Sequence, residues 1–164
     1  IQTMATRILF VCLGNICRSP LAESIFKEMA AQAGRAAEFE VDSAGTYDGH
    51  VGHPADRRTR AVAAAHGLPL DHTVRQVAQA DFDNFDLILA MDFENKADLL
   101  SFSTLTPEQK AKVKLFREYD PQARGSFDMN VPDPYYGASN GFELVYAMLE
   151  RTAKGLLASL SPQS

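Results

Sequence analysis

The chain has few cysteines and no long hydrophobic run, and both absences limit what the protein can be. Its 164 residues include two cysteines, Cys12 and Cys17, which are too few and too close together for a disulfide framework. We therefore expect a reducing, cytoplasmic environment. No stretch approaches the ~20 apolar residues of a membrane span, and the run at 8–12 is too short for a signal peptide. We expect no membrane association.

Basic residues are also scarce, with 16 Lys and Arg against 21 Asp and Glu, which gives a net charge of −5. This balance argues against general nucleic-acid binding, because nucleic acids select basic surfaces. An anionic substrate would have to be attracted by a local positive pocket. The length suits one domain, which we expect over residues 4–164. Residues 1–3, before Met4, resemble a cloning remnant.

One segment, VCLGNICRSP at 11–20, carries most of the chemical information. Five residues separate Cys12 from Arg18, with a buried-strand pattern before them and a helical pattern after them. The backbone N–H groups of such a turn can converge on an anion, and the helix dipole favours negative charge there. The Arg18 guanidinium matches phosphate oxygens. The same field favours the thiolate of Cys12, so the segment predicts phosphoryl transfer to sulfur.

Other interpretations of this segment fit less well. A dinucleotide turn needs three glycines and only Gly14 is present, and a nucleoside triphosphate loop needs a lysine that the segment lacks. Cys12 and Cys17 have no second pair of ligands nearby for zinc. The interpretation that Cys12 and Cys17 are merely buried structural cysteines does not explain the presence of Arg18 and Ser19 in the same segment.

Strand-like runs alternate with helical patterns along the chain, which predicts an α/β fold with a parallel sheet. Strands are expected at about 7–11, 39–43, 73–76, 86–90 and 114–116, and helices at about 20–33, 55–66, 93–100, 107–111 and 141–159. Ser19 suits the N-cap of the first helix and Pro20 its first turn. Ligands bind at the carboxyl ends of strands in such sheets, which is where the Cys12 turn falls.

Attack on a phosphate ester expels an alkoxide or phenoxide, which needs a proton from a positioned acid. Asp133 is the candidate, because prolines on both sides restrict its backbone and Tyr135 and Tyr136 could wall a slot for an aromatic ring. A solvated aspartate in a proline-rich turn is the competing interpretation. Asp92 is a rival acid, although its default role is to cap the helix that follows it.

The chain resembles the low-molecular-weight protein tyrosine phosphatases of bacterial type. Four stretches carry the resemblance: VCLGNICRSP at 11–20, VDSAGT at 41–46, the pair Asp71-His72, and DPYYG at 133–137. The resemblance implies a single α/β domain with a four-stranded parallel twisted sheet, helices on both faces, and the phosphate-binding loop between the first strand and the first helix. It implies removal of phosphate from phosphotyrosine in proteins, with inorganic phosphate or similar oxyanions as further ligands and with no metal or organic cofactor.

The resemblance also implies a role for individual residues. Cys12 would be the nucleophile that forms phosphocysteine, Arg18 would bind the phosphoryl oxygens, and Asp133 would be the general acid and later the base. Asn15 would hold the loop in shape through Ser43 and His72, and Ser19 would hydrogen-bond the thiolate. The remaining loop residues are Leu13, Gly14, Ile16 and Cys17. Tyr47, His50, Tyr135 and Tyr136 would form the substrate rim.

Several questions stay open from the sequence. Many relatives carry a bulky aromatic residue where this chain has Gly49, which puts substrate preference in doubt. An arsenate reductase of the same fold would need cysteines beyond Cys17, and a protein-arginine phosphatase would carry a small polar residue in place of Ile16. A non-catalytic phosphate-binding module would not need both Cys12 and an acid. Cys17 could protect an oxidised Cys12 through an internal disulfide, or merely fill space.

Overall fold

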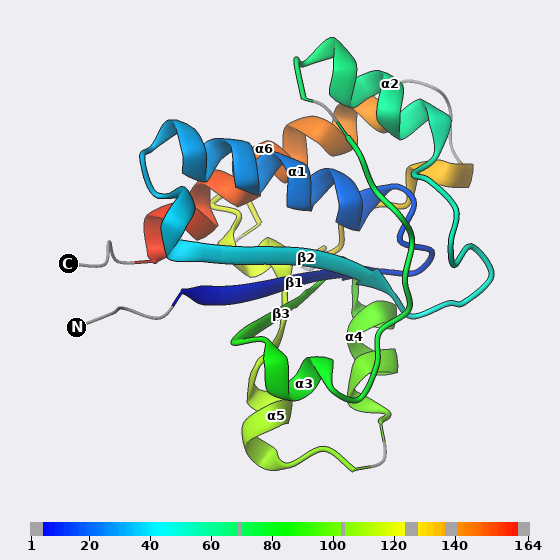
Figure 1. The fold of residues 1–164 in the computed structure, drawn as a ribbon, viewed down its shortest axis with the longest axis vertical. Coiled ribbons are helices and arrows are strands. Elements are labelled where there is room, and N and C mark those ends of the chain that lie inside the picture. Colours follow the sequence, from blue (N-terminus) through cyan, green and yellow to red (C-terminus); the bar gives the residue numbers. More distant parts are fainter. Residues whose placement is uncertain (1–4, 69, 103, 124–127, 137–140, 161–164) are drawn as a thin grey trace.

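A four-stranded parallel sheet lies between two layers of helices (Figure 1). The computed structural model describes residues 5–68, 70–102, 104–123, 128–136 and 141–160, so residues 1–3, expected to be a cloning remnant, lie outside it. The strand order is β2-β1-β3-β4. The strands are β1 (Thr6–Cys12), β2 (Phe39–Gly45), β3 (Leu87–Ala90) and β4 (Val113–Leu115). The expected fold class is confirmed.

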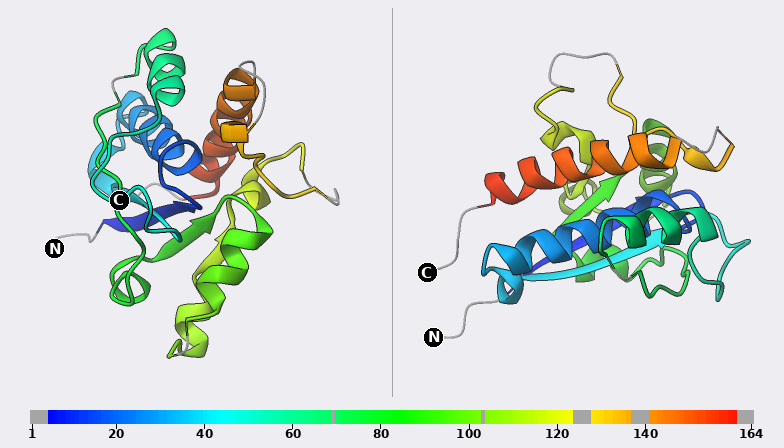
Figure 2. Two further views of the ribbon diagram at one scale, coloured as in Figure 1. Left: turned by 90° about the vertical axis from the view of Figure 1, so that its right-hand side faces the viewer. Right: turned by 90° about the horizontal axis from the view of Figure 1, so that it is seen from above.

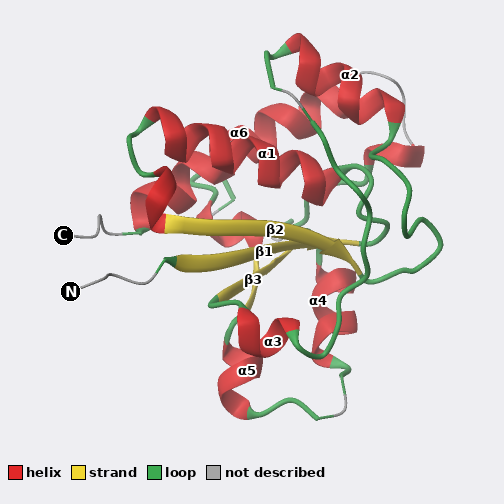
Figure 3. Ribbon diagram, viewed as in Figure 1, coloured by secondary structure: helices red, strands yellow, loops and turns green. Residues whose placement is uncertain are grey.

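Helices cover both faces of the sheet (Figure 3). One side carries α1 (Arg18–Gln32), α2 (Arg57–Ala65) and α6 (Gly141–Ser159), and the other carries α3 (Asp81–Asn84), α4 (Phe93–Leu100) and α5 (Pro107–Ala111). Two further views show α6 running beside α1 (Figure 2). The described part of the chain also contains three short 3-10 helices: η1 (Ala36–Glu38), η2 (Phe116–Tyr119) and η3 (Pro134–Tyr136). Within the described residues, no helix is long and apolar enough to cross a membrane.

β1 is one of the two inner strands of the sheet, and its side chains contribute to both layers of the core. Ile8 and Phe10 belong to the cluster under α1 and α6, whereas Leu9 and Val11 belong to the cluster under α4. All four side chains are fully buried. The alternation follows from the two-residue period of a strand, and burial on both faces explains why β1 is a continuous apolar run. Cys12 ends this strand and is itself buried, so it is carried by a fully buried part of the sheet.

Two local expectations were wrong. Ser19 does not cap the first helix, because α1 begins at Arg18 and the N-cap position belongs to Cys17, whose side chain makes no capping hydrogen bond. The Ser19 hydroxyl is directed to Cys12 instead. The strand expected at 73–76 is reduced to one isolated bridge between Gly45 and Gln76. The helices expected at 93–100, 107–111 and 141–159 are confirmed.

Candidate active site

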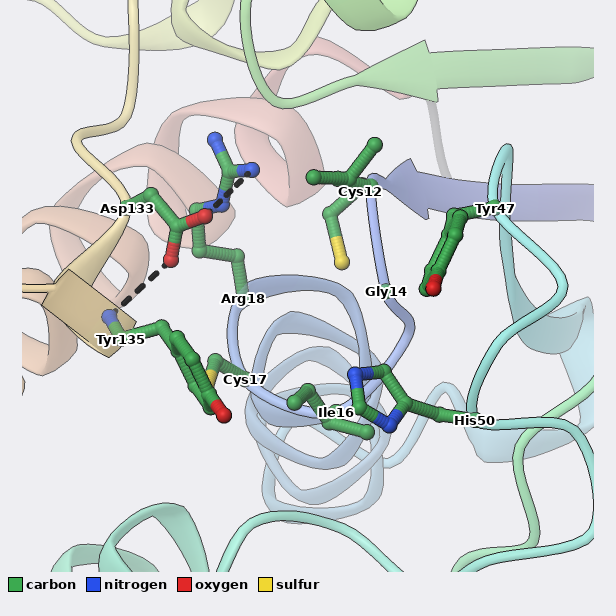
Figure 4. Close-up of a pocket in the computed structure, with 10 residues that line it drawn as sticks. Cys12, Gly14, Ile16, Cys17, Arg18, Tyr47, His50, Asp133 and Tyr135 are labelled. Carbon is green, nitrogen blue, oxygen red and sulfur yellow. Dashed lines mark hydrogen bonds and ion pairs between the residues drawn. The ribbon is translucent and has the colours of Figure 1, made fainter.

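The turn between β1 and α1 forms the floor of a pocket at the carboxyl ends of the strands (Figure 4). The pocket is lined by Cys12, Leu13, Gly14, Ile16, Cys17, Arg18, Tyr47, His50, Asp133 and Tyr135. These residues come from the loop after β1, the loop after β2 and the segment that contains η3. The structure therefore brings together the loop, the candidate acid and three of the four rim residues named from the sequence.

The Cys12 sulfur is held by two polar groups at the bottom of this pocket. The Ser19 hydroxyl lies 3.0 Å from the sulfur, and the Asn15 backbone N–H donates to it at 3.3 Å. The Asn15 side-chain amide donates to the Ser19 oxygen at 2.8 Å, which leaves the hydroxyl proton of Ser19 free to point at the sulfur. Ser19 and Asn15 therefore hold the sulfur in a fixed position at the floor of the pocket.

Asn15 holds the loop in a conformation that few side chains adopt. Its φ is 57°, in the left-handed region, which costs about 1 kcal/mol and which asparagine tolerates better than most residues. Its amide nitrogen donates to Ser19 and, at 3.1 Å, to Ser43, and its amide oxygen accepts from the Arg75 backbone N–H at 3.1 Å and from His72 Nε2 at 3.0 Å. These bonds fix the strained backbone.

His72 and Ser43 are each held in place by a further contact. His72 Nε2 also lies 3.0 Å from the Asn15 carbonyl oxygen, and because both of its partners are acceptors, Nε2 carries the proton. The Ser43 hydroxyl donates to Glu23 at 2.7 Å, which leaves its oxygen free to accept from Asn15. Ser43 and His72 thus occupy the positions around Asn15 that the sequence resemblance implied.

Arg18 is buried, with its guanidinium fixed on two sides. Nη1 donates to Asp92 at 2.6 Å and to the Val131 carbonyl at 3.0 Å, while Nη2 lies 3.6 Å from an Asp133 oxygen. Burial alone would lower the pKa of Arg18, but Cys12, Asp92 and Asp133 outweigh it and raise the pKa. The guanidinium is therefore permanently charged beside the sulfur.

Asp92 performs the helix-capping role that the sequence suggested and a second role that it did not. One carboxylate oxygen accepts from the Asn95 backbone N–H at 2.7 Å at the start of α4, and the other binds Arg18. Asp92 is not among the residues that line the pocket, whereas Asp133 is. The arrangement favours Asp133 over Asp92 as the group that meets a leaving oxygen.

Asp133 is the residue before η3, and its side chain projects into the pocket (Figure 4). The Tyr135 backbone N–H donates to Asp133 Oδ1 at 3.0 Å, which orients the carboxyl group and leaves Oδ2 toward Arg18. The Asp133 side chain is 29% exposed, so it is neither a freely solvated turn residue nor a buried one. This geometry suits a group that must exchange protons with both a substrate and water.

Aromatic side chains stand on either side of the pocket mouth (Figure 4). Tyr47 and His50 lie on one side, with ring centroids 5.8 Å apart, and Tyr135 lies on the other. The Tyr47 ring lies over Gly49, because a Cβ atom at Gly49 would be 2.1 Å from it. The Tyr47 ring therefore occupies the space that a side chain at position 49 would need. Tyr136 belongs to η3, but its side chain falls outside the described part of the structure.

Cys17 lies within the same pocket but is only 4% exposed. Burial raises the pKa of its thiol to about 12, so Cys17 is protonated at neutral pH. It is therefore no rival to Cys12 as a nucleophile.

Sequence reasoning missed Glu23, the Arg75 backbone and the Val131 carbonyl, and it missed the second role of Asp92. Only Asp92 had a usable signal, because it follows a strand whose carboxyl end lies at the same edge of the sheet as Cys12. The other partners come from distant segments that carry no pattern of their own.

A family model described as low molecular weight phosphotyrosine protein phosphatase matches residues 7–164. The chain belongs to this family. It is 46% identical, over 98% of its length and 96% of the relative, to a low molecular weight protein-tyrosine-phosphatase of Streptomyces coelicolor. Among solved structures, a protein tyrosine phosphatase of Entamoeba histolytica superposes with a TM-score of 0.88 at 37% identity, covering 94% of this chain and 96% of that one. A drosophila arginine phosphatase superposes with a TM-score of 0.85 at 31% identity, covering 96% of this chain and 99% of that one.

Proposed function

We propose that this phosphatase removes phosphate from phosphotyrosine in protein substrates through a phosphocysteine intermediate. The Cys12 thiolate attacks phosphorus and the bond from phosphorus to the tyrosine oxygen breaks. Arg18 and the loop N–H groups stabilise the phosphoryl oxygens, and Asp133 gives a proton to the leaving phenoxide. The supporting observation is that the Cys12 sulfur, the Arg18 guanidinium and the Asp133 carboxyl group meet in one pocket.

The second half-reaction uses the same groups in reverse. Water attacks the phosphorus of phosphocysteine, the Asp133 carboxylate takes a proton from that water, and the bond between phosphorus and sulfur breaks. Inorganic phosphate leaves and the Cys12 thiolate is restored. Ser19, through its 3.0 Å contact with the sulfur, stabilises the thiolate as leaving group.

The chemistry of the pocket wall favours an aryl ester. Ile16 offers an aliphatic surface, and Tyr47 and Tyr135 stand on opposite sides of the mouth. A flat phenyl ring gains from such contacts, whereas a charged guanidinium phosphoramidate would lose hydration against Ile16. We therefore place phosphotyrosine ahead of phosphoarginine. Arsenate reduction coupled to further cysteines has no support, because the sequence holds only Cys12 and Cys17. The cytoplasmic location stays a prediction.

A direct comparison of substrates tests the proposal. Phosphotyrosine, phosphoarginine and phosphoserine are placed in one peptide sequence, and phosphate release is measured with wild type and with Cys12→Ser as the blank. We expect kcat/KM to be highest for phosphotyrosine and turnover to be lost in the variant, whose hydroxyl is not ionised at neutral pH. A preference for phosphoarginine would overturn the substrate assignment, and an active Cys12→Ser variant would overturn the mechanism.

A further inference from the structure

Arg58, in the first turn of α2, contacts the segment that carries Asp133. Its Nη2 donates to the Tyr135 carbonyl oxygen at 3.3 Å, and its guanidinium carbon lies 5.3 Å from the centroid of the Tyr135 ring. The same guanidinium lies 4.7 Å from the Phe142 ring, near the start of α6. Arg58 therefore joins three elements, α2, η3 and α6, at one side of the pocket.

Arg58 is also connected to the phosphate-binding loop, through hydrogen bonds with Asp56. Asp56 accepts from the Arg58 backbone N–H at 2.8 Å and from its side chain at 3.2 and 3.3 Å. The Asp56 backbone N–H in turn donates to the Ile16 carbonyl at 2.9 Å. Hydrogen bonds thus run from the loop that holds Cys12, through Asp56 and Arg58, to Tyr135.

Tyr135 decides where the Asp133 carboxyl group points. Its backbone N–H donates to Asp133 Oδ1 at 3.0 Å, while Oδ2 lies 3.6 Å from Arg18. η3 is a single three-residue turn, and so short a 3-10 turn is not stable on its own. Whatever fixes the peptide groups of Tyr135 therefore also fixes the carboxyl group.

We propose that Arg58 is a positioning residue for the general acid: it ties η3 to α2 so that the Asp133 carboxyl group faces the leaving-group oxygen. This rests on the proposed role of Asp133. Arg58 itself touches neither the sulfur nor the phosphoryl group. A planar guanidinium suits the task, because it can hydrogen-bond Asp56 and the Tyr135 carbonyl while its faces lie against two rings.

The test uses substrates that differ in their need for an acid. Phenyl phosphate has a poor leaving group, whereas 4-nitrophenyl phosphate has a good one. kcat/KM is measured for both with wild type, Arg58→Gln, Arg58→Lys and Asp133→Ala. The matched control is Arg60→Gln, which removes the same charge from α2. Arg60 is exposed, donates to the Ala55 carbonyl at 3.1 Å, and lies two residues, about 200°, around the helix from Arg58.

We expect Arg58→Gln to lower kcat/KM for phenyl phosphate by roughly ten-fold and for 4-nitrophenyl phosphate by less than about three-fold, because a misplaced acid matters only where protonation limits the rate. Arg58→Lys should recover part of the loss. Arg60→Gln should match wild type. Competitive inhibition by inorganic phosphate should stay within about two-fold in all Arg58 variants, since the phosphate-binding loop is intact.

A double-mutant cycle separates positioning from a general loss of structure. If Arg58 acts through Asp133, adding Arg58→Gln to Asp133→Ala should cause little further loss on phenyl phosphate. The inference would be overturned if the kcat/KM losses of Arg58→Gln and Asp133→Ala multiplied in the double variant. Equal losses of the Arg58 variants on the two esters, or no loss in either Arg58 variant, would also overturn it. Should Arg58→Gln not fold, Arg58→Lys is judged by the same criteria. Equal losses on both esters in Asp133→Ala alone would instead show that the acid assignment is wrong, and the Arg58 inference would fall with it.

Discussion

The Arg18 guanidinium and the Asp92 carboxylate meet at 2.6 Å, although 74 residues separate them in the sequence. Only 3% of the Arg18 side chain and 19% of the Asp92 side chain are exposed. A buried charge pair of this kind orients the guanidinium more than it stabilises the fold, because desolvation offsets much of the attraction. The guanidinium of Arg18, the first residue of α1, is therefore oriented by Asp92, which lies near the carboxyl end of β3.

Replacing Asp92 should impair catalysis through Arg18. We expect Asp92→Ala to lower kcat/KM by roughly ten-fold or more, since truncating one partner of a buried charge pair costs about 2 kcal/mol or more. Asp92→Asn should be milder, because an amide oxygen can still accept from Arg18 or cap α4. Steady-state kinetics with 4-nitrophenyl phosphate and thermal melting measure the two effects. Wild-type kinetics in Asp92→Ala would contradict the prediction.

Removing the proposed acid should discriminate between leaving groups. We expect Asp133→Ala to slow hydrolysis of phenyl phosphate by about 10²–10⁴-fold, the usual effect of a lost general acid. The loss should be smaller for 4-nitrophenyl phosphate, whose leaving group needs less protonation. An unchanged rate on both esters would point to Asp92 as the acid, and the same pair of substrates applied to Asp92→Asn would then identify it.

A methyl group at Gly49 should displace Tyr47. The added Cβ would lie 2.1 Å from the Tyr47 ring, so the ring must leave its place beside the pocket. We expect Gly49→Ala to raise KM for aryl phosphates while leaving KM for alkyl phosphates unchanged. Tyr47→Ala is the matched control and should have the same effect. If the double variant were worse than either single one, the two residues would act independently.

Cys17 should protect an oxidised Cys12 more effectively at high pH. Peroxide converts the Cys12 thiolate to sulfenic acid, and attack by the Cys17 sulfur would form a disulfide and release water. Because the pKa of Cys17 is raised to about 12, its reactive thiolate is scarce at pH 7 and grows about ten-fold per pH unit below that pKa. Recovery of activity in dithiothreitol, measured from pH 7 to 9 (about two units), should therefore rise in wild type.

The matched variant for this experiment is Cys17→Ser. It should recover less activity at every pH, and only wild type should lose two protons in mass when oxidised. Equal recovery by both proteins would mean that Cys17 only fills space beside the loop.

Asp120 should contribute to the stability of the folded protein near neutral pH, and this contribution should be lost in acid. Burial alone would raise its pKa, but hydrogen bonds from Arg151, the Gln122 backbone and Arg117 lower it from 3.8 to about 2. Because the folded-state pKa lies below the unfolded one, the contribution is fully present above about pH 4 and is lost as the pH falls through about 2. It amounts to about 2 kcal/mol. Urea unfolding of wild type and Asp120→Asn across this range should show a larger acid-dependent loss in wild type, because Asp56, whose pKa is also lowered, is present in both proteins.

The first strand, the Cys12 turn and the helix that follows could be predicted from local sequence, because hydrophobic period and residue spacing are local properties. Local signals also predicted the bounds of α4, α5 and α6: Asp92 precedes α4, Pro107 begins α5, and a helical apolar pattern runs along α6. Cys12 and Arg18, the proposed nucleophile and phosphate-binding residue, lie within seven consecutive positions, so they could be proposed without knowledge of distant segments.

The groups that surround that turn could be identified only from the folded arrangement of the chain. Ser19 suits a helix cap from its neighbours alone, but the fold begins α1 at Arg18 and places the Ser19 hydroxyl 3.0 Å from the Cys12 sulfur. The partners of Asn15 and Arg18 lie on other segments, and Tyr47 finds its place only because Gly49 has no side chain. Such contacts depend on how the strands pair and how the loops pack against one another. Neither produces a periodic pattern along the sequence.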